Sequence, residues 1–150
     1  MYHQPSEKFA KPFDKKTDKL IELNSRTIKS MAHELIRHII SLDLFHDTVI
    51  YYRSDGRWIS CSSNRDSNRY TVEHKFQGKT YTWYERKDDD PNDYFEYNGH
   101  ILSASFEGPL CHSINSEIDS NMRTQLNNFF SHYGLYYELG NQWNLSLYEA

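Results

Sequence analysis

The apolar positions in the first third of the chain recur with a helical period. No proline or glycine occurs between Lys16 and Leu44, and charged residues such as Lys29 separate the apolar positions. The apolar residues follow one another mostly at steps of three and four: Ile28, Met31, Ala32, Leu35, Ile39 and Leu42. This spacing lines one face of an α-helix, so we expect one long amphipathic helix over the whole stretch. We expect it to begin near Thr17 or Asp18, because either side chain can cap the first turn.

After this helix the pattern changes to short β-branched and aromatic runs. The runs 48–53 and 58–61 flank Asp55-Gly56, a dipeptide that favours a two-residue β-hairpin because both turn positions need a positive φ. Apolar and polar residues alternate again over 70–76 and continue after Gly78. The alternation predicts a second hairpin in this region.

The last third of the chain predicts one more strand, a second helix and a final hairpin. Residues 101–107 alternate between apolar and serine positions until Gly108-Pro109, which ends the strand. A second helical stripe runs from Ile118 to Tyr133 and is followed by Gly134, at the position of a C-cap. Two further apolar runs flank Gly140-Asn141, which we expect to form a two-residue hairpin loop.

Strands joined by hairpins pair antiparallel, so the pattern predicts an α+β fold. We expect a long N-terminal helix and a second helix in the C-terminal half, both packed on an antiparallel sheet of about five to seven strands. The chain has 150 residues, a length that fits a single domain. Residues 1–16 contain two prolines among four lysines, and we expect them to form a flexible arm, with residues 17–150 forming the domain.

Composition narrows the classes of function. The hydrophobic share of 37% is low, but aromatic residues make up 15% of the chain, which favours a folded domain because aromatic side chains supply much burial. A formal charge of −4 gives no reason to expect direct binding of nucleic acid or of an anionic membrane. No apolar run approaches the roughly twenty residues of a membrane helix, and the polar N-terminus does not resemble a signal peptide. Cys61 and Cys111 lack CxxC spacing, so we expect reduced thiols in a cytoplasmic protein.

Two groups of residues carry side chains that are typical of metal or catalytic sites. His33 and His38 resemble a zinc motif that is one residue too long, because five residues turn a helix through about 140° and separate the two rings. We therefore expect no metal, and no motif predicts another cofactor. Cys111 lies close in sequence to His100 and His112, so a Cys/His-dependent enzyme is one alternative function.

A third group favours contact with a partner. The acidic run from Asp88 to Asp93 lacks the spacing of a calcium loop, and we expect it to be a solvated loop that engages an Arg/Lys-rich surface. The strand before it combines tyrosine, tryptophan and arginine, the residue types that dominate interface hot spots. The predicted partner-binding residues are Asp88, Asp89, Asp90, Asp93, Tyr81, Trp83, Tyr84 and Arg86.

The leading hypothesis is a non-enzymatic protein-binding module. In its small size, acidic charge and richness in tyrosine and asparagine, the chain resembles accessory proteins of phages and mobile elements, including anti-CRISPR proteins. That resemblance in composition implies inhibition of a host defence or nucleic-acid-handling enzyme. Besides the Cys/His enzyme, the alternative is a small-molecule or nucleotide binder that uses the aromatic strands as a pocket. The sequence does not specify an oligomeric state.

Overall fold

The computed structural model describes residues 13–14, 19–20, 23–94, 101–116, 121–141 and 143–149. Its elements are β1 (Phe13–Asp14), β2 (Lys19–Leu20), α1 (Ser25–Ser41), β3 (Thr48–Ser54), β4 (Arg57–Ser62), β5 (Tyr70–Phe76), β6 (Lys79–Lys87), the short 3-10 helix η1 (Pro91–Asp93), β7 (Leu102–Phe106), α2 (Pro109–Asn115), α3 (Asn121–Ser131), β8 (Leu135–Asn141) and β9 (Asn144–Glu149). The predicted arm, residues 1–16, lies outside the described residues except for Phe13–Asp14, whose backbone pairs with Lys19–Leu20.

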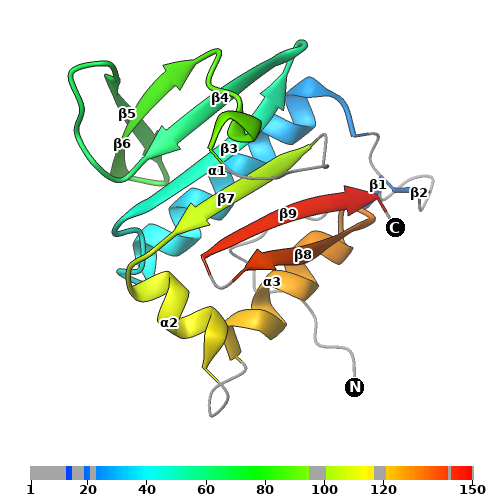
Figure 1. The fold of residues 1–150 in the computed structure, drawn as a ribbon. Helices are drawn as coiled ribbons and strands as arrows, with labels where there is room; N and C mark the ends of the chain where they lie inside the picture. Colours follow the sequence, from blue (N-terminus) through cyan, green and yellow to red (C-terminus); the bar gives the residue numbers. More distant parts are fainter. Residues whose placement is uncertain are drawn as a thin grey trace.

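Seven strands form one sheet in the order β5-β6-β4-β3-β7-β9-β8, and every neighbouring pair is antiparallel. Helix α1 packs against β3, α3 packs against β8, and α2 packs against α3. Figure 1 shows α1 and α3 on the same side of the sheet, behind it in this view. The fold is therefore α+β with helices on an antiparallel sheet, as the pattern predicts. In the described part of the chain, no helix is both long and apolar enough to cross a membrane.

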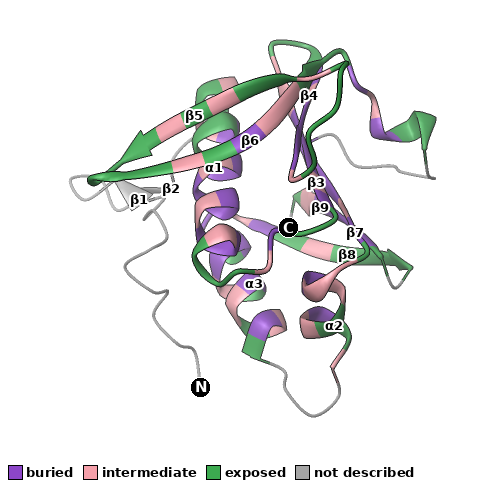
Figure 2. Cartoon of the chain, turned by 90° about the vertical axis from the view of Figure 1, so that its left-hand side faces the viewer, coloured by how far each residue is buried: buried purple, intermediate pink, exposed green. Residues whose placement is uncertain are grey.

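The core lies between the helices and the sheet face that they cover. Successive side chains of a strand point to opposite faces, so alternate residues such as Leu102 and Phe106 of β7 enter the core, where neither is exposed. The apolar stripe of α1 meets them: Leu35 is 2% exposed and Ile39 1% exposed. Figure 2 shows this division, with buried residues along the sheet-facing side of α1. The stripe predicted from the sequence is thus confirmed as core.

Helix α1 begins later than expected. Residues 19–20 form β2, and the helix spans Ser25–Ser41, so the prediction of a long helix starting near residue 17 was wrong. Asn24 is the N-cap, and its Oδ1 accepts a hydrogen bond from the Thr27 backbone N–H at 3.0 Å. The Asn24 cap therefore sets the start of the helix. The sequence pattern did not show this start, because no proline or glycine interrupts the residues before Asn24. The two expected cap residues, Thr17 and Asp18, lie outside the described residues.

The first two hairpins have the predicted turns. Asp55 and Gly56 have φ values of 50° and 78°, and Gln77 and Gly78 have φ values of 50° and 79°, as a two-residue turn of this kind requires.

The third hairpin turns later than predicted. Strand β8 runs through Gly140 to Asn141, which pairs with Asn144, and the register shifts at this point. A Cβ on Gly140 would lie 2.2 Å from Asn144 Oδ1, so glycine leaves room for the Asn144 side chain, which accepts a hydrogen bond from the Asn141 backbone N–H at 3.2 Å. Asn141 Oδ1 accepts from the Trp143 backbone N–H at 2.9 Å and forms the turn itself.

Two further elements differ from the predictions. Gly108-Pro109 ends β7 but also begins the short helix α2, because proline is well suited to the first helical position. Helix α3 begins at Asn121, and its predicted start near Ile118 lies outside the described residues. Gly134 follows α3 with φ 71°, in agreement with its predicted role at the C-terminus of the helix.

Candidate functional site

The hairpin of β5 and β6 extends beyond the core of the molecule. No residue of β5 is buried, and in β6 only Trp83 is buried. Figure 2 shows the hairpin crossing over α1 and continuing past it. Alternation along the strands divides the side chains between the two faces. The residues on the face toward α1 include Tyr70, Val72, His74, Phe76, Lys79, Tyr81, Trp83 and Glu85.

At the base of the hairpin, the Glu85 carboxylate accepts hydrogen bonds from three neighbours. Trp83 Nε1 donates to its Oε1 at 3.1 Å, and Tyr70 OH donates to its Oε2 at 2.9 Å. The Cys61 thiol is 3.7 Å from Oε1, a distance typical of a weak S–H donor. Burial, followed by the nearby Glu85 charge, raises the pKa of Cys61. Cys61 is therefore a protonated packing residue and is not activated as a nucleophile.

His33 lies between this carboxylate and the aromatic rings of the hairpin. Its ring centroid is 5.1 Å from that of Trp83 and 5.3 Å from that of His74. Its Nε2 is 3.9 Å from Glu85 Oε1, and this buried nitrogen finds no hydrogen-bond partner among the described residues. Burial, followed by His74 and the cations Lys29 and Arg37, lowers the pKa of His33 from 6.5 to about 4. His33 is therefore neutral at pH 7.

Nearer the tip of the hairpin, Arg37 joins α1 to β5. Its guanidinium carbon lies 3.8 Å from the centroid of the Phe76 ring, and its Nη1 is 2.9 Å from His74 Nε2. Burial and the charge of Arg37 lower the pKa of His74, so the ring is neutral and its Nε2 accepts this hydrogen bond. A cleft of about 520 Å³ opens beside these residues. We call it the hairpin cleft; it is lined by Glu34, Arg37, His38, Ser41, Phe76, Gln77, Lys79 and Tyr81.

The predicted partner-binding residues of β6 do not share one surface. Tyr81 lines the hairpin cleft, whereas Trp83 has no exposed surface and cannot contact a partner in this conformation. Tyr84 and Arg86 lie on the opposite face of β6 from Tyr81 and Trp83, because each lies an odd number of positions along the strand from Trp83 and side chains alternate between faces. Tyr81 and Trp83 therefore lie on a different face from Tyr84 and Arg86, and Tyr81 lines the hairpin cleft.

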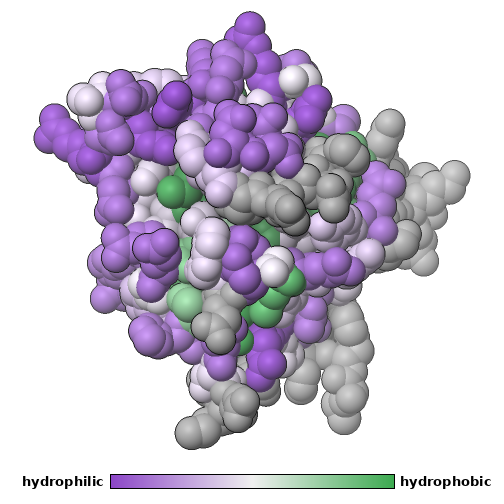
Figure 3. All heavy atoms as spheres, viewed as in Figure 1, coloured by the Kyte–Doolittle hydropathy of each residue, from purple (hydrophilic) through white to green (hydrophobic). Residues whose placement is uncertain are grey.

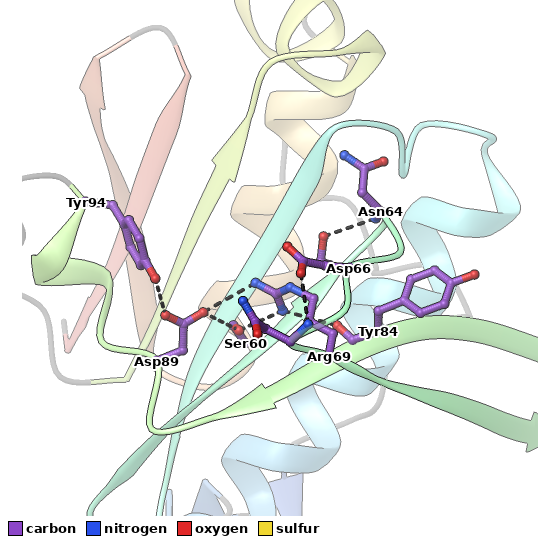
Figure 4. Close-up of polar contacts among 9 residues, drawn as sticks. Ser60, Asn64, Asp66, Arg69, Tyr84, Asp89 and Tyr94 are labelled. Atoms are coloured by element: carbon purple, nitrogen blue, oxygen red, sulfur yellow. Dashed lines mark hydrogen bonds and ion pairs between the residues drawn. The ribbon is translucent and has the colours of Figure 1, made fainter.

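The acidic run is also divided by the fold. Asp89 was expected to be solvated, but it is 2% exposed. Figure 4 shows its carboxylate held by Ser60, Arg69 and Tyr94. Ser60 Oγ donates to Oδ2 at 2.6 Å, Arg69 Nη2 lies 3.3 Å from Oδ2, and Tyr94 OH donates to Oδ1 at 2.5 Å. Asp89 therefore anchors the loop to the sheet and is not available to bind another protein.

The other acidic residues have different surroundings. Asp88 is well exposed and lies 3.7 Å from Arg57 Nε, and Asp93 is exposed. Asp90 Oδ1 accepts from the Asn92 backbone N–H at 2.9 Å and caps the helix η1. Of the four predicted carboxylates, Asp88 and Asp93 are thus the exposed ones, and Asp88 pairs with Arg57.

The sheet face away from the helices offers little apolar surface. Tyr51 and Trp58 form a small buried cluster there. Figure 3 views this face, and polar residues cover most of the part that is coloured, with apolar atoms confined to small areas near its centre. A large apolar docking patch is absent from the visible, described surface of this face.

The histidine and cysteine residues considered for a metal or catalytic site do not come together in one site among the described residues. His38 Nε2 is 2.6 Å from Gln125 Oε1 of α3, whereas His33 packs on the hairpin, so the two histidines lie in different environments. Cys111 is half-buried on α2 and His112 is exposed, while His100 lies outside the described residues. Among the residues that the structure describes, no group of three or more histidine, cysteine or acidic side chains is arranged to hold a metal ion.

No family model, curated protein or solved structure matches the chain. Sequence reasoning did not identify Arg37 and Phe76 as residues of the cleft, nor His74 as the partner of Arg37. The alternation of β5 places His74 and Phe76 on one face, and Arg37 lies one turn after His33 on α1. Those two patterns were visible in the sequence, but the contact between α1 and β5 was not.

Proposed function

We propose that this chain is a non-enzymatic protein-binding module and that the hairpin cleft is its binding surface. The observation that supports this most directly is Phe76, which is 40% exposed although the Arg37 guanidinium already stacks on its ring. Tyr81 lines the same cleft. Arginine beside tyrosine and other aromatic rings is the composition of binding hot spots in protein interfaces.

The cleft is also held in place before any partner arrives. His74 fixes one end of the Arg37 guanidinium and the Phe76 ring supports its plane. An ordered arginine loses less side-chain freedom on binding than a free one, so more of its interaction energy contributes to affinity. The guanidinium has five N–H donors, of which the hydrogen bond to His74 uses one. We therefore expect the partner to place a carboxylate against Arg37 and an apolar side chain against Phe76 and Tyr81.

The exposed acidic residues support a second contact with the partner. Asp88 and Asp93 would attract a basic surface and accelerate encounter. We further propose that the partner is a host defence or nucleic-acid-handling enzyme that this chain inhibits, as anti-CRISPR proteins do, a proposal that the composition of the chain supports. We place this activity in the cytoplasm, because Cys61 and Cys111 are both free thiols.

Affinity capture tests the proposal. Immobilised wild type is compared with Phe76→Ala and Tyr81→Ala in extracts of the native host, with quantitative mass spectrometry as the readout. Tyr136→Ala is the control, since Tyr136 is equally exposed (43%) but lies on the opposite edge strand. We expect the cleft variants to lose the proteins that wild type and Tyr136→Ala both capture. Equal capture by the cleft variants would exclude the cleft, and no enrichment by wild type over blank resin would contradict protein binding.

A second candidate function is binding of a small anion such as a nucleotide. A hollow of about 490 Å³ near the start of α1 is lined by three cations, Lys29, Arg57 and Lys87, and by the rings of Tyr52 and Tyr70. Cations bind phosphate and tyrosine rings stack on bases. Two carboxylates also line the hollow, so we rank this function second. A rise in Tm with ATP that Lys87→Gln abolishes would support it, and an unchanged Tm would exclude it.

A further inference from the structure

Strand β5 is at one edge of the sheet. In the described part of the chain its sole neighbour is β6. Phe76 and Lys79 flank the two-residue turn at Gln77-Gly78, so they form a hydrogen-bonded pair of the antiparallel ladder. Non-hydrogen-bonded and hydrogen-bonded pairs then alternate along the strand. Residues 71, 73 and 75 therefore point their backbone N–H and C=O groups away from β6. Such an edge can accept another strand.

The edge carries two opposite charges, and among the described residues neither forms an ion pair. Glu73 and Lys75 are both exposed and lie on the face away from α1. Across the ladder they face Thr82 and Thr80, which are uncharged. Charged residues on an edge usually prevent pairing with another chain. Here they are of opposite sign and two residues apart, so an antiparallel copy of the same strand can match them.

We infer that β5 pairs antiparallel with β5 of a second copy of this chain, about a two-fold axis at His74. In this register Glu73 of each copy lies opposite Lys75 of the other, and such cross-strand pairs of opposite charge are stabilising. The neighbouring registers would place two Glu73 or two Lys75 side chains opposite each other. Charge therefore selects one register from those that the backbone allows.

The same register also matches apolar residues on the other face. Val72 of each copy lies opposite Phe76 of the other, and Phe76 is 40% exposed in the single chain. Pairing would cover part of this ring, which favours association. A closed two-fold arrangement limits the assembly to two copies, since each chain uses its β5 edge once. The contact is small, so we expect a reversible dimer that forms at micromolar or higher concentration. This inference does not depend on the proposed function.

Sedimentation velocity over a range of concentrations tests the pairing. The monomer mass is 17.9 kDa, and we expect the wild type to shift toward twice this mass as its concentration rises. Glu73→Lys makes both edge charges positive and Lys75→Glu makes both negative, so each variant alone should remain monomeric. The equimolar mixture of the two should dimerise again, and so should the double swap. Glu138→Lys, an exposed change on the other edge strand, should dimerise like wild type.

Every outcome of these measurements either supports or overturns the pairing of β5 with a second copy. The three substituted positions, Glu73, Lys75 and Glu138, are all exposed, and circular dichroism verifies that every variant is folded. A wild type that stays monomeric at all concentrations would overturn the inference. Dimerisation of the two single variants to the wild-type extent, or failure of their mixture to associate, would show that β5 does not form the contact.

Discussion

Asp88 and Asp89 are neighbours in the chain but differ in their surroundings. Asp89 is buried, and its carboxylate accepts hydrogen bonds from Ser60 and Tyr94 and pairs with Arg69, whereas Asp88 is exposed. Asp89→Asn leaves the Arg69 guanidinium, 11% exposed, without its countercharge. We expect this change to lower the free energy of unfolding by about 3–5 kcal/mol, the range for breaking a buried ion pair. Urea denaturation measures it.

Asp88→Asn is the matched control for this prediction. It removes the same charge from the adjacent position, and an exposed ion pair contributes about 0–1 kcal/mol. If both variants unfold at the same urea concentration, the loop is not anchored through Asp89.

His33 makes the stability of the protein depend on pH. Burial lowers the pKa of His33 from 6.5 to about 4 in the folded protein. Between these values the unfolded chain binds more protons, so stability rises with pH and is lost as the pH falls from 6.5 toward 4. A difference of this size corresponds to about 3 kcal/mol. Urea titrations from pH 4 to 7.5 should show this loss in wild type.

Leucine cannot be protonated at this position, so His33→Leu should avoid most of this loss of about 3 kcal/mol in the free energy of unfolding between pH 6.5 and 4. The exposed His112 provides the control, because His112→Gln should retain the wild-type slope. A slope in His33→Leu equal to that of wild type would assign the pH dependence to other groups.

At the scale of elements, α1 stabilises the sheet through its apolar stripe. Leu35 is at the centre of this stripe and is 2% exposed. We expect Leu35→Ala to lower the free energy of unfolding by about 2–5 kcal/mol, because a buried leucine leaves a cavity. Ser30→Ala, at an exposed position of the same helix, should change it by less than about 0.5 kcal/mol. Equal melting temperatures for Leu35→Ala and wild type would mean that the stripe does not hold the core.

Elements defined by strong local signals were predicted well. The Asp55-Gly56 turn is specified by the two residues that form it, so its hairpin followed from sequence alone. The start of α1 was misplaced because several residues before Asn24 fit the same helical period, and the preference for a cap is only about 1 kcal/mol. The Gly140-Asn141 dipeptide predicts a turn, but Gly140 instead leaves room for the Asn144 side chain, a contact that depends on strand pairing.

At the scale of the whole molecule, the fold class was predictable but the site was not. The class follows from counting hairpins and helical stripes along the chain. The hairpin cleft requires Arg37 of α1 to meet Phe76 of β5, a contact between residues far apart in sequence. Likewise, the burial of Asp89 depends on Arg69 from a different loop. Composition can indicate that such residues are present, but their meeting depends on the topology of the sheet.

Charge on the whole molecule should govern the rate of association with the partner. In the double variant Asp88→Asn/Asp93→Asn, we expect slower association and a weaker dependence on salt, since exposed charges are screened beyond about 8–10 Å at physiological ionic strength. Phe76→Ala should instead raise the dissociation rate with little salt dependence. Surface plasmon resonance with the captured partner, at low and high salt, separates the two effects. Association of the double variant at the wild-type rate at every salt concentration would show that Asp88 and Asp93 do not steer the encounter.

Hydrogen–deuterium exchange tests most directly whether the hairpin is the binding element. Amide exchange is followed by mass spectrometry for the protein alone and with the captured partner, at one fixed protein concentration. We predict that the partner slows exchange in β5, β6 and the C-terminal half of α1, with β8 and β9 unchanged. Protection confined to β8 and β9, with the exchange of the hairpin unaltered, would show that the hairpin is not the binding element.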